Sequence, residues 1–155
     1  MNVKVLAMGN ILMKDDAIGI EVAKEIESTL LEKEIEVIYG ETDIQYSISN
    51  IQEDDYIFVL DAACYGKSPG EITSLPLNTF VSNKKGYCGH NYSFLDLLKL
   101  YYPNVKGKIY AIEIKEVEFG FGLSTVLQDK LGDISEEILS KIHKSIKKKN
   151  WVKKL

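Results

Sequence analysis

Arginine is absent from this chain, and all 19 of its basic side chains are lysines. Bidentate guanidinium contacts to phosphate are therefore excluded, which argues against nucleic acid as a partner. Cysteine is scarce as well: Cys64 and Cys88 form no CxxC pair, and we expect both to be reduced thiols. No apolar run approaches the roughly 18 residues that a membrane span needs. Because Met1 also leads directly into a first strand, we expect a cytoplasmic protein without membrane insertion.

The length and composition are those of one ordinary globular domain, and we expect residues 1–155 to fold as a single unit and to remain a monomer. Residues 144–155 form a lysine-rich tail without acidic residues, so the rest of the chain holds all 23 acidic side chains against 13 lysines. Such an acidic body repels polyphosphates and suits metal ions or a basic peptide. We interpret the tail as a solvated helix end rather than as a membrane or nucleic-acid contact.

Apolar periodicity predicts an α/β fold. Strands are predicted over residues 3–8, 34–39, 56–60, 71–77 and 108–115. Helices are predicted over residues 15–31, 43–51, 90–101 and 135–149. The connection between the third and fourth strands is too short for a helical crossover, so the fourth strand should run antiparallel to its predecessor. This order predicts a three-layer αβα sandwich around a five-stranded, mostly parallel sheet with one antiparallel strand.

Two adjacent carboxylates, Asp15 and Asp16, follow the first strand and the Gly9-Asn10 turn. One carboxylate suffices to cap the next helix, because it accepts hydrogen bonds from free backbone N–H groups and is favoured by the helix dipole. The other carboxylate can then face whatever lies beyond the end of the strand.

Ligand sites in open α/β sheets lie outside the carboxyl ends of the strands. Asp16 follows the first strand, Asp61 ends the third, and His90 opens the helix after the fourth. Two carboxylates and one imidazole form a partial metal shell of mixed oxygen and nitrogen donors, with positions left open for a substrate.

Each of these side chains also has a purely structural interpretation. Asp16 could be the helix cap, Asp61 could bond the N–H groups of the next loop, and His90 could cap its helix or lie exposed. Cys88, two residues before His90, could be a nucleophile paired with it, although we favour an inert thiol. His143 lies among lysines and is expected to be solvated. The GxGxxG, P-loop and HExxH motifs are all missing.

The segment GNILMKDDAIGIEV resembles the N-terminal signature of the hydrogenase maturation proteases, the endopeptidases that process the large subunit of nickel–iron hydrogenases. The residues that match this signature are Gly9, Asn10, Leu12, Asp15, Asp16 and Gly19. The family's second signature is present as FVLDAA, with Asp61 and Ala62, followed by the Pro-Gly-Glu turn at residues 69–71. The third is a histidine that opens a helix, matched by His90 in HNYSFLDLL.

The resemblance implies that Asp16, Asp61 and His90 bind a divalent metal, and that Asp16 and Asp61 are catalytic, as in an aspartyl protease. It implies a reaction in which the C-terminal extension of a hydrogenase large-subunit precursor is removed after nickel has been inserted. The nickel would be supplied by the precursor, and zinc or cadmium could also occupy the site. We further expect substrate contacts from Gly9, Asn10, Gly40 and Thr42.

The chain departs from the family pattern in two places. Gly40-Glu41-Thr42 stands where many members have Gly-Gly-Thr, so Glu41 either hinders close backbone approach or adds a carboxylate. Ala17 replaces a common glycine.

Two mechanisms remain open. The metal could polarise the scissile carbonyl or activate water, or it could serve recognition while a carboxylate acts as general base, which we favour. The competing functions are a chaperone that binds the nickel-loaded precursor without cutting it and a Cys88–His90 thiol hydrolase.

Overall fold

The computed structural model describes residues 2–78 and 92–153. In chain order the elements are β1 (Val3–Met8), the 3₁₀ helix η1 (Lys14–Ala17), α1 (Ile18–Leu31), β2 (Glu36–Glu41), α2 (Ile44–Ser49), β3 (Tyr56–Ala63), β4 (Ile72–Pro76), α3 (Tyr92–Tyr101), β5 (Lys106–Glu113) and α4 (Thr125–Lys153). Among the described residues, no helix is both long and apolar enough to cross a membrane.

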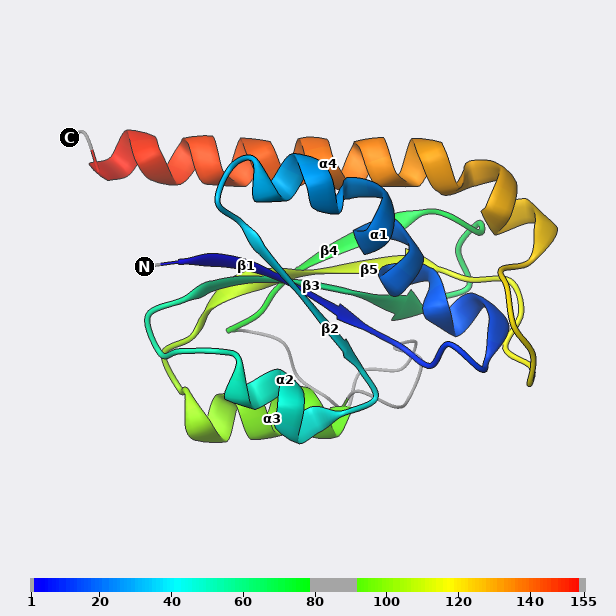
Figure 1. Ribbon diagram of the computed structural model, residues 1–155, viewed down its shortest axis with the longest axis horizontal. Coiled ribbons are helices and arrows are strands. Elements are labelled where there is room, and N and C mark those ends of the chain that lie inside the picture. Colours follow the sequence, from blue (N-terminus) through cyan, green and yellow to red (C-terminus); the bar gives the residue numbers. More distant parts are fainter. Residues whose placement is uncertain (1, 79–91, 154–155) are drawn as a thin grey trace.

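The strands form one sheet in the order β2-β1-β3-β5-β4. All neighbouring pairs are parallel except β4 and β5. Helices α1 and α4 cover one face of the sheet, and α2 and α3 cover the other (Figure 1). The predicted αβα sandwich with five strands is therefore confirmed. The antiparallel strand β4 lies at the edge, where it pairs with β5 rather than with β3.

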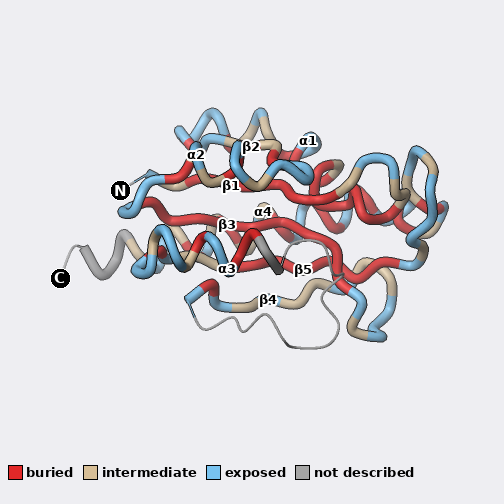
Figure 2. Tube along the Cα trace, turned by 90° about the horizontal axis from the view of Figure 1, so that it is seen from below, coloured by how far each residue is buried: buried red, intermediate tan, exposed pale blue. Residues whose placement is uncertain are grey.

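Alternation along the central strands divides the core into two layers. In β3, Phe58 and Leu60 pack with α1 and α4, while Ile57 and Val59 pack with α2 and α3. All four side chains are fully buried. Figure 2 shows the same burial along β1, β3 and β5. A continuous apolar run is thus the expected sequence of a strand covered on both faces.

The last helix begins ten residues earlier than predicted. Residues 125–134 continue the apolar stripe of α4, which packs against α1. The stripe consists of Leu127, Leu131, Ile134, Ile138 and Ile142. Gly132 and Asp133 resemble a helix break in the sequence, but both are exposed within the helix, so burial of the stripe outweighs their weak helix propensity. Ser135, where the predicted helix begins, is a buried residue inside α4.

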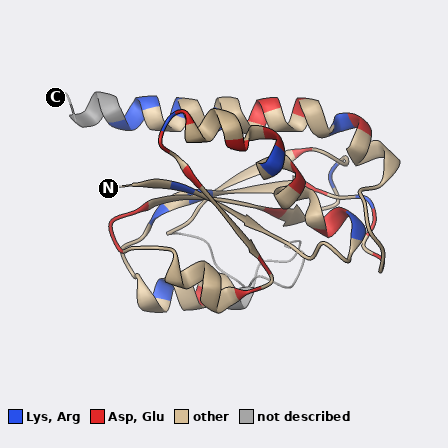
Figure 3. Ribbon diagram, viewed as in Figure 1, with Lys and Arg blue, Asp and Glu red and all other residues tan. Residues whose placement is uncertain are grey.

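The charge along α4 changes sign, as Figure 3 shows. Acidic residues occupy its first half and lysines its last turns. Lys144, Lys147 and Lys148 are exposed, which agrees with the interpretation of the tail as a solvated helix end. The Nζ atom of Lys149 lies 3.5 Å from the centre of the Tyr56 ring, a cation–π contact that ties the helix end to β3.

Glu41 ends β2 with a left-handed backbone, at φ 51°. The strand predicted to end at residue 39 continues through Gly40 and Glu41. The register between β1 and β2 shifts at this point, and the Glu41 carbonyl accepts the Gly9 N–H at 3.0 Å. The exposed Glu41 side chain adds no buried carboxylate to the edge.

We expect Glu41→Gly to stabilise the protein by about 0.5–1 kcal/mol, because glycine adopts positive φ without the steric cost that other residues carry. Urea unfolding at equilibrium measures this change. The control is Glu36→Gly at the start of the same strand, an exposed position where φ is not positive. The Glu36→Gly variant should be less stable than the wild type. A loss of equal size in Glu41→Gly would contradict the inference that the positive φ at residue 41 costs stability.

Candidate functional site

The carboxyl ends of the parallel strands β1 and β3 bring the acidic pair and Asp61 to one edge of the sheet. Helix η1, which carries the acidic pair, packs against β3. The approach depends on Gly19 in the first turn of α1. A Cβ atom there would lie 2.5 Å from the Leu60 carbonyl oxygen and 3.1 Å from that of Met8. Any larger residue would push α1 away from both strand ends.

Asp16 is 3% exposed, and its Oδ2 atom accepts the Asn10 N–H at 2.8 Å. The turn before it fits closely around η1: Gly9 has φ 142°, and a Cβ on it would clash with the Asp16 carbonyl oxygen. Asn10 in turn accepts the Leu12 N–H at 2.9 Å through its Oδ1 atom. Gly9 and Asn10, predicted as substrate contacts, thus hold Asp16 in place.

Asp61 lies inside β3 and not after it, because the strand continues to Ala63. The carboxylate is 2% exposed, and Oδ1 accepts the N–H of Ala62 at 2.8 Å. Strand alternation places Asp61 on the same face as Val59 and Ala63, which belong to the core layer of α2 and α3. Burying a carboxylate is costly without polar partners, and the Ala62 N–H is one such partner.

Asp15 is the structural member of the acidic pair. It is fully buried, and its Oδ1 atom accepts the Ser124 N–H at 2.7 Å. Its Oδ2 atom accepts the Ser124 hydroxyl at 2.8 Å and the N–H groups of Lys115 and Glu116 at 3.1 and 2.9 Å. The carboxylate therefore joins η1 to the connection between β5 and α4. Asp15 is the anchor, and Asp16 is the carboxylate directed to the Gly9-Asn10 turn.

A comparison with known protein families identifies the family to which this chain belongs. A family model described as HycI, hydrogenase maturation protease, matches residues 20–141. The chain belongs to the hydrogenase maturation protease family. It is accordingly a peptidase, and proteases of this family act on hydrogenase large-subunit precursors. The matched range contains Asp61 and begins after Asp16.

Similar proteins agree with this assignment over nearly the whole chain. A curated protein of Methanocaldococcus jannaschii, provisionally named a hydrogenase maturation protease, is 25% identical over 149 residues, which cover 94% of this chain and 92% of that protein. The structure of the maturation protease HybD from Thermococcus kodakarensis has a TM-score of 0.71 at 25% identity, covering 92% of this chain and 99% of that one. HybD of E. coli has a TM-score of 0.73 at 21% identity, covering 94% of each chain, and shows the same fold.

His90 and Cys88 lie outside the residues that the structure describes. Within the described ranges, no three His, Cys, Asp or Glu side chains are grouped to hold a metal. The expected ligand set of this maturation protease therefore remains a prediction. Cys64 is disulfide-bonded in the structure, so the expectation of a reduced thiol at this position is wrong.

Glu113 is a buried carboxylate that the sequence analysis missed. It ends β5 opposite Ala63, so it shares the face of the sheet that carries Asp61. Both of its carboxylate oxygens lie 3.0 Å from the N–H of Tyr65, which fixes the start of the connection between β3 and β4. The signal that could have identified it is a charged residue at an apolar position of an alternating strand.

Gly40 and Thr42 differ in their surroundings. Gly40 is buried, and a Cβ there would clash with the Ser47 hydroxyl and lie 2.8 Å from the Met8 sulfur. Glycine at this position allows α2 to pack against β2. Thr42 is exposed. Their predicted contacts with substrate stay predictions.

We expect Asp15→Asn to lower the free energy of unfolding by roughly 2–4 kcal/mol, because an amide nitrogen cannot accept the N–H and O–H groups that the carboxylate satisfies. Urea unfolding of both proteins measures the loss. Asp129→Asn, an exposed position on α4, is the matched control and should stay within about 0.5 kcal/mol of the wild type. A loss below about 1 kcal/mol in Asp15→Asn would contradict the anchor role assigned here.

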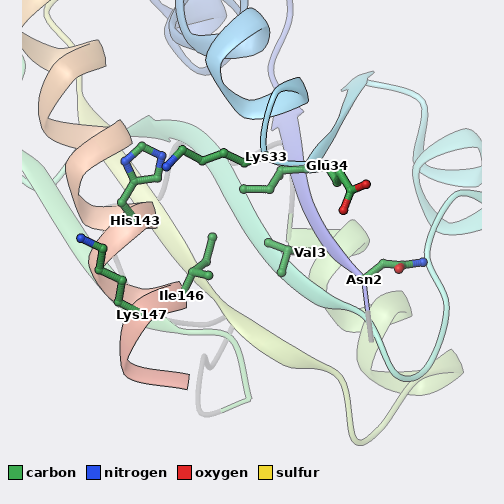
Figure 4. Close-up of a pocket in the computed structure, with 8 residues that line it drawn as sticks. Asn2, Val3, Lys33, Glu34, His143, Ile146 and Lys147 are labelled. Carbon is green, nitrogen blue, oxygen red and sulfur yellow. The ribbon is translucent and has the colours of Figure 1, made fainter. Parts of the chain in front are cut away.

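A cavity of about 410 Å³ lies at the opposite edge of the sheet, near the start of β1. Figure 4 shows His143 and Ile146 of α4 facing Val3, with Lys33 directed toward the imidazole ring. The Nε2 atom of His143 is buried and has no hydrogen-bond partner, so the expectation of a solvated side chain is wrong for this atom. Burial and the positive charges of Lys33 and Lys147 lower the pKa of His143 below its ordinary value of 6.5.

This lowered pKa predicts a pH-dependent stability. Below pH 6.5 the unfolded chain binds a proton at His143 that the folded protein does not bind, so stability falls as the pH falls. We expect His143→Leu to remove this loss, so that its stability advantage over the wild type widens from pH 8 to pH 5. Thermal melts across that range measure the difference, with the exposed Ser140→Ala as control. If the difference in stability between His143→Leu and the wild type were the same at all pH values, protonation of His143 would not be the cause of the pH dependence.

Proposed function

We propose that this chain is the endopeptidase that removes the C-terminal extension of a hydrogenase large-subunit precursor, with Asp16, Asp61 and His90 recognising the nickel that the precursor carries. The observation that supports it is the pair of buried carboxylates, one on η1 and one in β3, where η1 packs against β3 at the carboxyl edge of the sheet. Membership of the hydrogenase maturation protease family supplies the class of reaction.

Hydrolysis of the precursor requires a base that accepts a proton from water while the water oxygen attacks the scissile carbonyl. A carboxylate held by a backbone N–H fits this role, and Asp16 and Asp61 both have such a bond. The proton then passes to the nitrogen of the departing peptide, which leaves as a free amine. The peptide bond is thereby replaced by a carboxylate on the shortened subunit and an amine on the released extension.

Nickel in this scheme belongs to the substrate and marks the precursor as ready for cutting. Two carboxylates and one imidazole are oxygen and nitrogen donors, a set that binds nickel and would also accept zinc or cadmium. Cys64 is disulfide-bonded and offers no thiolate for tight binding of a resident metal. We therefore favour recognition over a permanently bound catalytic metal. We also place the protein in the cytoplasm as a monomer, where it would meet the newly made precursor.

We expect Asp16→Asn and Asp61→Asn each to slow processing at least 100-fold, the loss typical of a removed general base. The measurement is the mass of a nickel-loaded precursor after incubation with each variant. Asp129→Asn, on the exposed face of α4, should process at the wild-type rate.

Two outcomes would contradict this proposal. A precursor that is bound but never shortened by the wild type would indicate a nickel-dependent chaperone. Loss of cleavage in Cys88→Ala with normal cleavage in Asp61→Asn would indicate a thiol hydrolase.

A further inference from the structure

Five apolar side chains lie exposed on two connections at the carboxyl edge of the sheet. The set consists of Ile11, Leu12, Val117, Phe119 and Phe121, and we name it the edge surface. Phe119 and Phe121 are 81% and 79% exposed. Single exposed apolar residues are common, but several on two neighbouring connections, two of them phenylalanines, point to an interaction site.

The two connections form one surface because their backbones are bonded to each other. Met13 and Gly120 form a β-bridge, and the Gly120 N–H donates to the Leu12 carbonyl at 2.7 Å. The Lys14 N–H donates to the Gly120 carbonyl at 3.0 Å. The buried carboxylate of Asp15 holds the same two connections together beneath this surface. The phenylalanines are therefore presented on a supported backbone, which lowers the entropy lost on binding a partner.

The edge surface is continuous with the candidate site. Ile11 and Leu12 directly follow Asn10, whose N–H donates to the carboxylate of Asp16. Figure 1 places the connections after β1 and after β5 together beyond the ends of the parallel strands. The edge surface therefore begins beside the turn that holds Asp16.

The charges around the edge surface balance one another. The Nζ atom of Lys14 lies 3.2 Å from the Glu116 carboxylate and 3.5 Å from that of Glu118. Exposed Lys115 supplies a second positive charge. A locally neutral, apolar surface selects an apolar partner surface rather than a highly charged segment.

We propose that the edge surface docks the folded body of the large-subunit precursor, with Phe119 and Phe121 as anchors that enter apolar depressions of the substrate. This inference rests on the proposed function, since it assigns a role to a surface beside the same site. A second copy of this chain is a poorer occupant, because a copy seated there would cover the edge that carries the candidate site. Aromatic anchors of this kind carry a large share of the binding energy at protein interfaces.

The test is the double variant Phe119→Ser/Phe121→Ser. Its matched control is Leu100→Ser/Tyr101→Ser at the end of α3, where the two side chains are 76% and 64% exposed. Both pairs remove comparable exposed apolar area, so thermal unfolding should show that both variants keep the fold. We expect the first pair to raise the KM for the full-length precursor at least tenfold with kcat nearly unchanged, and the control pair to change KM less than twofold.

Direct binding separates this proposal from the proposed function. The dissociation constant is measured with precursor that carries no nickel, which by the proposed function is not cut, with and without each pair of substitutions. A tenfold weaker complex for the phenylalanine pair alone supports docking, even if the wild type never shortens the precursor. Equal dissociation constants, no binding by any variant, or loss of a dimer on replacing the phenylalanines would each overturn it.

Discussion

The buried carboxylate of Asp15 is the interaction on which the edge of this molecule depends. A fully buried charge must be compensated, and here the compensation comes from a hydroxyl and backbone N–H groups between Lys115 and Ser124. These groups lie about a hundred positions further along the chain than Asp15 itself. One side chain thereby fixes η1 relative to β5 and α4. The neighbouring Asp16 takes its position from that anchor, and the exposed phenylalanines of the edge surface take theirs from the same connection.

The two adjacent aspartates are chemically identical, and they differ because their surroundings differ. Asp15 is surrounded by donors from the far end of the chain, whereas Asp16 bonds the N–H of the Gly9-Asn10 turn directly before it. Close packing makes this arrangement possible, because Gly9 and Gly19 admit backbone atoms where any side chain would clash. These two glycines thus allow η1 and α1 to approach the ends of the strands closely. That close approach in turn fixes where the two carboxylates lie.

Most of the fold was predictable because local patterns and the global architecture agree. The apolar run of β3 predicted a central strand, and the short connection after it predicted the antiparallel strand. The start of α4 was not predictable from Gly132 and Asp133, since only packing against α1 shows that the helix continues through them. The buried carboxylate of Glu113 was missed for a similar reason, because its partner Tyr65 is distant in sequence.

By itself, the sequence determined the layers of the fold, the family signatures and the two carboxylates of the candidate site. Periodicity and short motifs are local, and they specify which residue types follow which strand. Only the tertiary structure decided which aspartate is the anchor, because the donors that surround Asp15 come from the connection between β5 and α4. Only the tertiary structure also showed that Gly120, between Phe119 and Phe121, lies beside residues 12–14, because backbone bonds join these two separate connections.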